Sequence, residues 1–447
     1  MRMSRKLDMT RGHALALVVQ FAIPLCLGNL LQQLYLTVDT MVVGRFCGSV
    51  SLAALATSAQ PVELLLHLFM GLGGGVSILV SQYQGSGEQQ RMRDMLNTAV
   101  FFLYLCSLFV TVLGLFAGPA VLRMMRVPDE VIPPGLSYLR IIFLGTLGSL
   151  GYNMNAGVLR GLGDSHSSLI FLIISCVTNV ILDVLFVAVL HMDVGGAAIA
   201  TVMAQYLSWV LSILYIHRRY PELKLPVWPA KMDSSLLREI TRISIPLGIN
   251  NSFYAVGHLL MQALINLQGA AFIAACSIGA KMLDLSNVAC PAISMAITTY
   301  AGQNYGAKRF DRVKRGALLP LFSGLVSLCA SMLMLLFSES LLRCFTTDPA
   351  VMEEVRFYLR IVPPFICIYT VFNGIIALAN GIGDVRYPTV VNLLTLWAFR
   401  IPLGNLILHF FDGRYAIAAI PISFGFGLVS MLFFYRSHRW KEVCLRA

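Results

Sequence analysis

Four of the 22 acidic residues lie well inside long apolar stretches of the chain, where an ionised side chain is costly and usually has a function. They are Asp39, Glu63, Asp183 and Asp284. Asp39 is expected near the outer end of the first apolar span, and Asp183 in the outer half of the fifth. Two neighbouring carboxylates in a medium of low dielectric cannot readily both stay ionised unless a cation or a proton neutralises them. The pair is therefore a candidate site for coupling to an ion gradient.

Amide and hydroxyl side chains are expected close to these two acids. Asn179 precedes Asp183 by four residues and so lies on the same helix face. The sixth span brings Thr201 to a comparable depth, and Asn153 on the fourth span lies nearer the middle. We predict a cation-binding or coupling site made of Asp39, Asn153, Asn179, Asp183 and Thr201. The simpler alternative is that each acid is satisfied separately by backbone donors or by a hydrogen bond between helices.

The other intramembrane charges suggest a role in lining or gating a cleft. Glu63 has His67 four residues later, and Asp284 has Lys281 three residues earlier, so each acid faces a basic partner on its own helix. Both pairs are open to two interpretations: self-neutralised pairs, or contacts for a substrate or proton. Arg400 is expected to be paired or to extend toward a polar cavity.

Two prolines occupy the same place in two apolar spans. Pro24 lies in the first span and Pro246 in the seventh. Because a proline inside a span frees a carbonyl and permits a bend, both are candidate hinges, with a static kink as the alternative.

The composition requires a membrane. The chain is 57% hydrophobic and 12% charged, with a mean hydropathy of +0.75, whereas an ordinary soluble domain carries about 25% charge. A helix of about 20 apolar residues spans a bilayer. Twelve such spans are predicted, near residues 14–41, 50–80, 96–118, 133–158, 167–190, 195–216, 240–267, 271–300, 316–338, 354–378, 387–411 and 415–435.

The chain contains an internal repeat with an offset of about 220 residues. GVLRGLGD ending at Asp164 matches ALANGIGD ending at Asp384, and Pro24-Leu25 matches Pro246-Leu247. We predict an all-α polytopic membrane protein with 12 transmembrane helices in two six-helix bundles, related by pseudo-two-fold symmetry along the membrane normal. The predicted domains are an N-terminal lobe at 1–216, a cytoplasmic linker at 217–238 and a C-terminal lobe at 239–447.

The net charge of +11 reflects topology rather than a nucleic-acid partner. With both termini inside, 23 of the 33 Lys and Arg side chains fall on the inner side and 6 on the outer side. This asymmetry predicts a multi-pass plasma-membrane protein with cytoplasmic N- and C-termini. The ten cysteines are scattered without a C-x-x-C pair, which is typical of buried thiols rather than disulfides or metal ligands.

Several functional classes lack their sequence signals. No Gly-Lys dipeptide occurs, so the chain has no Walker A loop to bind ATP. No H-E-x-x-H or G-x-S-x-G motif occurs and the eight histidines are dispersed, which argues against a membrane-embedded enzyme. We expect no catalytic residues, no cofactor and no metal beyond Na⁺ at the coupling site.

The chain resembles the multidrug and toxic compound extrusion (MATE) family over essentially its whole length. The resemblance lies in QQLYLTVDTMVVGRF around Asp39 and in five further segments. These are LRGLGD, NVILD at 179–183, GAAIAT at 196–201, GQNYGA at 302–307 and FRIPLG at 399–404. The resemblance implies a V-shaped pair of bundles that exports amphipathic, often cationic compounds in exchange for Na⁺ or H⁺. Some members use acids in spans 7 and 10, where this chain has Tyr254 and Tyr369, so we interpret it as a type with a first-lobe cation site.

The predicted function is therefore secondary antiport by alternating access. The partners expected are a small amphipathic organic substrate and the lipid bilayer, with a monomeric chain and no nucleic acid. The nearest alternative is a flippase for a lipid-linked precursor, for which more spans and a strongly cationic cleft are typical. A passive channel and a membrane-embedded enzyme are the remaining alternatives.

Overall fold

The computed structural model describes residues 6–125, 127–228 and 232–436, and all regular structure in these ranges is helical. Nine of the described helices are long and apolar enough to cross a membrane, and α9 (Ala270–Ser286) with α10 (Ala289–Gly306), bent by 45°, makes a tenth if counted as one span. Helices predominate because lipid offers no hydrogen-bonding partner to a backbone, and a helix satisfies its own backbone groups.

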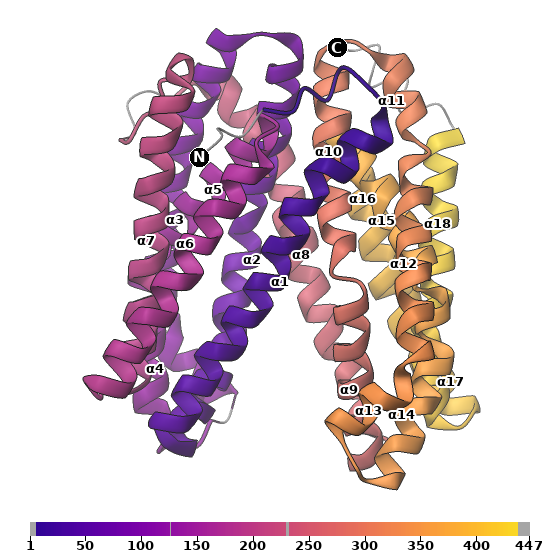
Figure 1. Cartoon of the computed structure of the whole chain (residues 1–447). Coiled ribbons are helices and arrows are strands. Elements are labelled where there is room, and N and C mark those ends of the chain that lie inside the picture. The colour runs from indigo at the N-terminus through magenta and orange to yellow at the C-terminus, as the bar shows by residue number, and fades with distance from the viewer. Residues whose placement is uncertain (1–5, 126, 229–231, 437–447) are drawn as a thin grey trace. The chain divides into compact units, whose positions relative to one another are not determined.

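The described chain divides into two compact units. Unit 1 holds Met1–Asp8 and Leu27–Ile249, and unit 2 holds Met9–Cys26 and Asn250–Ala447. This division differs from the predicted lobes at residues 9–26 and 239–249, and the predicted lobe boundaries stay a prediction. Two helices pass from one unit to the other, namely α1 (Ala14–Phe46) and α8 (Ser234–Asn266) (Figure 1).

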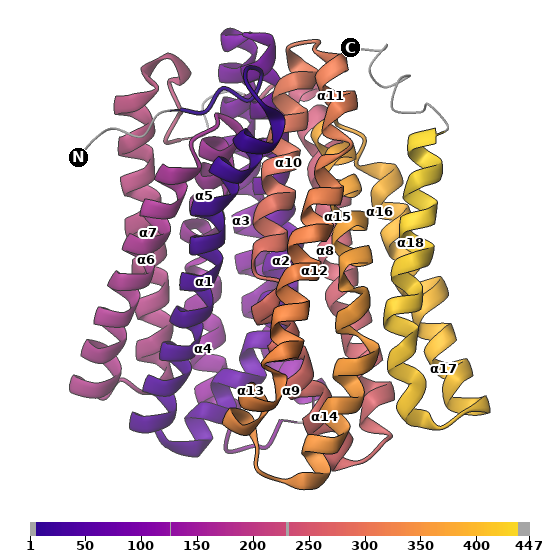
Figure 2. The same ribbon diagram turned by 45° about the vertical axis from the view of Figure 1, so that its right-hand side comes forward.

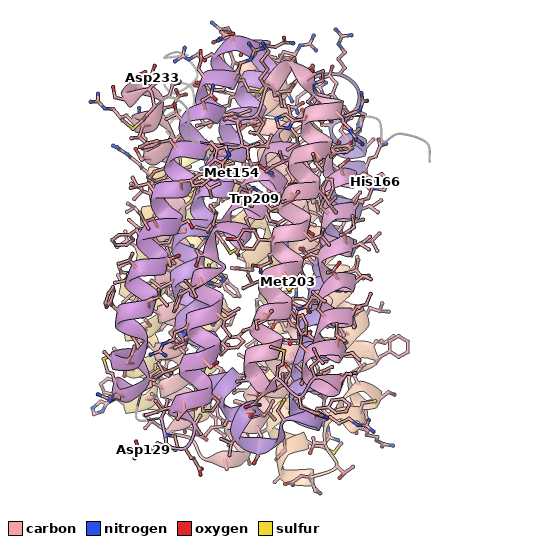
Figure 3. All side chains as sticks on the ribbon, turned by 90° about the vertical axis from the view of Figure 1, so that its left-hand side faces the viewer. Asp129, Met154, His166, Met203, Trp209 and Asp233 are labelled. Atoms are coloured by element: carbon pink, nitrogen blue, oxygen red, sulfur yellow. The ribbon has the colours of Figure 1, made fainter. Side chains whose placement is uncertain are left out.

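The helices of unit 1 follow α1 in chain order. They are α2 (Gly48–Ser86), α3 (Gln89–Met124), α4 (Ile132–Leu144), α5 (Thr146–Gly161), α6 (Ser165–Asp183), the π-helical η1 (Val184–Val189), α7 (Asp193–Arg219) and η2 (Pro221–Leu223). Figure 3 shows the side chains of this unit, with Asp129 and Asp233 at opposite ends and Met154, Met203 and Trp209 between them. Charged ends and an apolar middle are the pattern expected of a bundle in a bilayer.

Unit 2 continues from α9 and α10. Its further elements are α11 (Phe310–Gly316), α12 (Leu319–Leu336), α13 (Ser338–Phe345), α14 (Pro349–Ile361), η3 (Pro363–Phe365), α15 (Ile366–Gly381), α16 (Arg386–Leu393), the π-helical η4 (Leu394–Arg400), α17 (Ile401–Phe410), η5 (Gly413–Ala418) and α18 (Ala419–Arg436). Within this unit α15 packs against α10, α12 and α18 (Figure 2).

The repeat in the sequence is also a repeat of structural irregularities. The α4–α5 rod is interrupted at Gly145, and the matching α14–α15 rod is interrupted at η3. The next rod in each repeat carries a π-helical segment, η1 after α6 and η4 after α16. The two segments lie about ten residues apart in the register of the repeat. Because π-helical turns are rare and concentrate at functional sites, they direct attention to these two rods.

The two G-x-G-D turns have the same geometry. Gly163 and Gly383 both adopt φ 91°, a conformation that favours glycine. In each turn the aspartate N–H bonds back five residues, from Asp164 to Leu159 O (2.8 Å) and from Asp384 to Ala379 O (3.1 Å). These bonds satisfy the carbonyls that a helix end leaves free.

Glycine also brings two helices together in each repeat. A Cβ on Gly161 would lie 2.6 Å from the carbonyl oxygen of Ser77 in α2, and one on Gly381 would lie 2.5 Å from that of Thr298 in α10. Small residues allow such close backbone approach between helices in a membrane. The α2–α5 and α10–α15 contacts therefore depend on glycine.

The N-terminal segment is fixed by hydrogen bonds before α1 begins. In unit 1, Lys6 Nζ donates to Gln84 Oε1 (2.8 Å) and Leu7 N to Gly163 O (3.1 Å). In unit 2, the backbone of Met9 bonds to the side chains of Gln303 (2.9 Å) and Asn304 (3.0 Å), both in the GQNYGA segment. That segment thus holds the chain just before α1.

Candidate cation-binding site

Asp39 of α1 and Asp183 of α6 meet in the interior of unit 1. Their exposed fractions are 7% and 0%, and their carboxyl groups contact each other. In the described part of the chain, Oδ1 of each carboxyl has no hydrogen-bond partner. Leaving a buried carboxylate oxygen without a partner is expensive, so the pair has the chemistry of a site that takes up a proton or a hard cation.

Asn179 joins Asp183 to α7. In the orientation that satisfies both ends of its amide, the nitrogen of Asn179 donates to Asp183 Oδ2 (2.9 Å). Its oxygen then accepts from the backbone N (3.3 Å) and the hydroxyl (3.2 Å) of Thr201. The structure thus brings four of the five residues of the predicted site together, and the i, i+4 spacing of Asn179 and Asp183 is what places them on one face.

Tyr35 is a member of the cluster that sequence reasoning missed. Its phenol lies beside Thr201 and close to both Asp39 and Asp183. The signal was present, because Tyr35 precedes Asp39 by four residues and so shares its helix face. A phenol there adds a hydrogen-bond donor and acceptor to the oxygen-rich cluster.

Asp183 is also the residue directly before the π-helical η1. The π-helical pattern shows in the bond from Leu190 N to Leu185 O (2.9 Å), five residues back. A change in hydrogen-bond pattern next to a buried acid is a frequent feature of functional sites.

Asn153 is not brought into this hydrogen-bond network. Its amide nitrogen donates to the carbonyl of Ser149 in its own helix, at 2.9 Å. The matching Asn373 makes the same bond to Tyr369 O, at 3.0 Å, in the repeat that has no paired acids. The bond is therefore a property of the repeat, and a role of Asn153 in cation binding stays a prediction.

The predicted charge pairs of α2 and α9 have different outcomes. The side chain of Glu63 lies outside the described residues, so its pairing with the half-buried His67 stays a prediction. Lys281 and Asp284 are both exposed and, within the part of the chain that the structure describes, form no ion pair with each other. Exposed ions gain little from pairing, which explains why the helical spacing alone does not unite them.

Arg400 is buried inside unit 2. Its exposed fraction is 4%, and its Nε donates to the hydroxyl of Ser423 in α18 at 2.8 Å. The observed partner is thus a serine hydroxyl. Tyr369 lies close enough to interact electrostatically with Arg400, and the hydroxyl oxygens of Tyr369 and Tyr254 are 3.3 Å apart.

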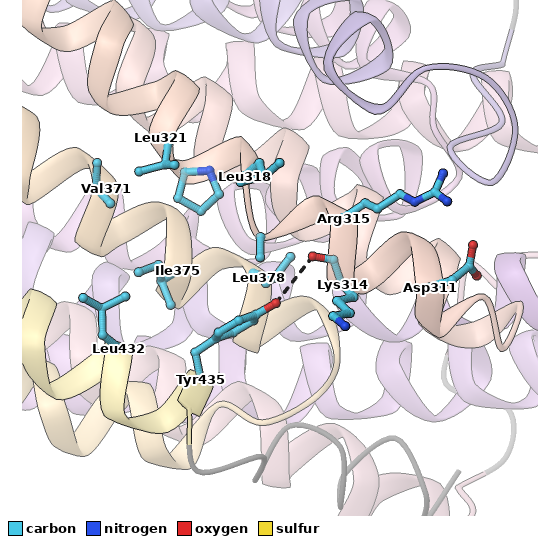
Figure 4. A pocket seen from close by; sticks show the side chains of 12 residues that line it. Asp311, Lys314, Arg315, Leu318, Leu321, Val371, Ile375, Leu378, Leu432 and Tyr435 are labelled. Atoms are coloured by element: carbon cyan, nitrogen blue, oxygen red, sulfur yellow. Dashed lines mark hydrogen bonds between the residues drawn. The ribbon is translucent and has the colours of Figure 1, made fainter.

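Unit 2 contains a cavity of about 600 Å³ that involves none of the predicted site residues (Figure 4). Its walls are mainly apolar, with Leu321, Ile375 and Leu432 among them, and Lys314 and Arg315 lie at one end. Tyr435 donates to the carbonyl of Lys314 at 3.4 Å across this region. The cavity shares no lining residue with the acid cluster.

The helical units, the repeated spans and a buried acid pair define the class of the protein as a polytopic membrane transporter. The MatE family model matches residues 24–185 and again 246–406, starting at Pro24 and Pro246. The chain belongs to the MatE family, and this confirms both the predicted family and the internal repeat.

Known proteins agree with this assignment. The chain is 29% identical over 444 residues to the probable multidrug resistance protein YpnP of Bacillus subtilis, covering 98% of each chain. It is 23% identical over 399 residues to an FAD transporter of Shewanella oneidensis, covering 86% of each. A crystal structure of MATE in the straight conformation superimposes with a TM-score of 0.88 at 20% identity and covers 99% of each chain. The predicted twelve-helix, two-lobe fold is confirmed.

Proposed function

We propose that this chain is a secondary antiporter that exports amphipathic, cationic organic compounds in exchange for Na⁺ or H⁺ bound at Asp39 and Asp183. The observation that carries the proposal is the buried contact of these two carboxyl groups, each with one oxygen that lacks a partner among the described residues. A transporter coupled to an ion gradient needs a group whose occupancy differs between its states. The acid pair meets that need with Asn179, Thr201 and Tyr35 as neighbouring ligands or donors.

The two hinge prolines support a coupled movement. α1 contributes residues up to Cys26 to unit 2 and residues from Leu27 to unit 1, and α8 changes unit between Ile249 and Asn250. Pro24 and Pro246 lie two or three residues before these points. Because proline removes a backbone donor, the helix bends there at low cost. Cation binding at Asp39, further along α1, would bias the bend and so the state of the transporter.

The proposed substrate class rests on the charge of the first lobe and on the named relatives. Acids in the first lobe favour cationic cargo by charge complementarity, and YpnP is named a probable multidrug resistance protein. The relative named as an FAD transporter indicates that the family is not restricted to cations. We propose a monomer in the plasma membrane, with cytoplasmic termini and no organic cofactor. We also propose cleft-lining or gating roles for Glu63 and His67 in unit 1 and for Lys281 and Asp284 in unit 2.

The proposal is tested by dye efflux from proteoliposomes. Purified wild type and Asp183→Asn are reconstituted side by side, and efflux of a cationic dye is followed under an imposed Na⁺ gradient or an imposed pH gradient. We expect uphill efflux by the wild type under one gradient only, and loss of that efflux in the variant. A gradient-independent downhill flux would instead support a passive channel.

Two other outcomes would count against the proposal in different ways. Equal efflux by wild type and Asp183→Asn would remove the acid pair from the mechanism and leave export intact. Wild type that moves no dye but flips a fluorescent lipid-linked sugar would favour the flippase alternative. Asp129→Asn is the control, since it removes an exposed acid at one end of unit 1 without touching the pair.

A further inference from the structure

A buried positive charge lies in unit 2 without a carboxylate beside it. Arg400 has five N–H donors, and Ser423 Oγ accepts from Nε. The guanidinium carbon lies 5.1 Å from the centre of the Phe424 ring. Among the described residues no acceptor bonds to its two terminal nitrogens, which therefore keep four N–H groups for another partner.

Three acids of unit 2 are engaged in other ion pairs. Glu339 pairs with Arg356 (2.8 Å), and Glu354 and Asp412 both pair with Arg414 (3.2 and 3.1 Å). None of the ion pairs within the described ranges includes Arg400. A hydroxyl and an aromatic face do not neutralise a buried guanidinium, and an uncompensated buried ion costs several kcal/mol. An anion would compensate this charge.

Aromatic side chains beside Phe424 and Arg400 supply further donors. The Tyr369 ring lies 4.8 Å from Phe424, and its hydroxyl oxygen is 3.3 Å from that of Tyr254. In this pair one hydroxyl donates to the other, so one O–H remains available to a ligand. The Tyr254 ring also packs against His258 at 4.8 Å, and His258 is exposed, so the cluster reaches the surface of the unit.

The backbone places Arg400 at a deformed point of its rod. Arg400 ends the π-helical η4, and Pro402 follows within the first turn of α17. Because proline has no N–H to bond four residues back, the regular pattern cannot continue through this point. The equivalent rod of the first repeat also has a π-helical segment, η1, at a different register and beside Asp183.

We propose that Arg400, held in place by Ser423, forms with Tyr369 and Tyr254 an oxyanion site in unit 2 that binds the carboxylate of a zwitterionic organic substrate. The parallel N–H groups of a guanidinium match the two oxygens of a carboxylate, whereas a halide would use only one point of contact. Phe424 and Tyr369 offer flat apolar surface to the body of the same molecule. The inference rests on the proposed export function and extends its substrate class from cations to molecules that also carry an acid group.

The test compares two dyes that differ only at this group. A rhodamine methyl ester is a cation, and the corresponding rhodamine free acid carries a carboxylate as well. Binding of each dye to the purified full-length chain is measured by fluorescence polarisation, for wild type, Arg400→Gln and Arg400→Lys. We expect Arg400→Gln to weaken the free acid about tenfold or more and the ester less than twofold. Arg400→Lys should retain part of the affinity, because it keeps the charge but loses the planar fork.

The control is Arg356→Gln, which removes a surface arginine paired with Glu339 and should change neither dye. Equal weakening of both dyes by Arg400→Gln would overturn the proposal and assign Arg400 a packing role, as would a wild type that does not bind the free acid. Wild type that binds both dyes but expels neither under any gradient would count against the exporter alone. If the free acid binds wild type and Arg400→Gln with the same affinity, that result would count against this site alone.

Discussion

Asp183 and Arg400 are buried side chains of opposite charge on the corresponding rods of the two repeats, and each adjoins a π-helical segment. Asp183 directly precedes η1, and Arg400 is the last residue of η4. Each rod therefore carries a buried charge beside a π-helical segment, although the two segments lie about ten residues apart in the register of the repeat. The difference in charge gives each unit its own chemistry, an acid pair in unit 1 and a free guanidinium in unit 2.

Cation binding should stabilise the protein through the acid pair. A ligand present at about 100 times its dissociation constant adds about 2.7 kcal/mol to the apparent free energy of unfolding. We expect Na⁺, added in place of choline, or a lowered pH to raise the thermal unfolding temperature of the wild type. Asp39→Asn and Asp183→Asn should both lose the shift. The measurement is a thermal-shift assay on purified protein, and an undiminished shift in both variants would place the cation elsewhere.

Two asparagines predicted for the same site should behave differently. Asn179 donates to Asp183, whereas Asn153 donates to the backbone of its own helix. Loss of a group that orients a ligand typically costs about 10–100-fold in affinity. We expect Asn179→Ala to weaken cation binding by about that factor and Asn153→Ala to change it by less than about threefold. Cation affinity is measured by isothermal titration or from the thermal-shift midpoint as a function of cation concentration. Equal losses of affinity in the two variants would show that Asn153 is part of the site.

The two turn aspartates should contribute unequally to stability. Asp164 accepts hydrogen bonds from the backbone and hydroxyl of Ser167 and from the hydroxyls of Tyr215 and Tyr220, at 2.8–3.0 Å. Burial and the nearby Asp164 raise the pKa of Tyr220, which therefore stays a hydrogen-bond donor. We expect Asp164→Ala to cost about 3 kcal/mol or more, since hydrogen bonds to a charged group contribute about 1.5–3 kcal/mol each. Asp384→Ala should cost less, because its bond to the backbone N of Tyr387 is 3.5 Å long. Chemical unfolding of both variants tests the order.

Substitution by alanine should lower stability at a glycine in a close helix contact and leave it unchanged at a glycine in open space. A Cβ at Gly381 would lie 2.5 Å from Thr298 O, whereas a Cβ at Gly425 would meet no atom within 4 Å. We expect Gly381→Ala to destabilise unit 2 by about 1–3 kcal/mol through overpacking. Gly425→Ala should be neutral or slightly stabilising, because alanine favours a helix. Comparable losses of thermal stability in both variants would contradict the contact between α10 and α15.

The sequence was sufficient for the features that depend on local pattern. Apolar runs predict spans wherever a backbone must satisfy itself in lipid, and the matched G-x-G-D turns predict a repeat because glycine is needed at φ 91° in both. The spacing of Asn179 and Asp183 placed them on one face, and the same rule would have added Tyr35 to Asp39. Family membership followed from motifs that keep their order along the chain.

Tertiary structure decided which side chains meet. Asn153 has a side chain of the right type for the cation site, and here its amide donates to the carbonyl of Ser149 in its own helix. The helical spacing of Lys281 and Asp284 was not enough to form an ion pair, because pairing of exposed ions contributes little free energy. Nor could any pattern show that Arg400 is buried against Ser423 and Phe424, since these come from a helix more than twenty residues away. Local order follows from the chain itself, whereas the partner of a buried charge depends on how separate helices pack.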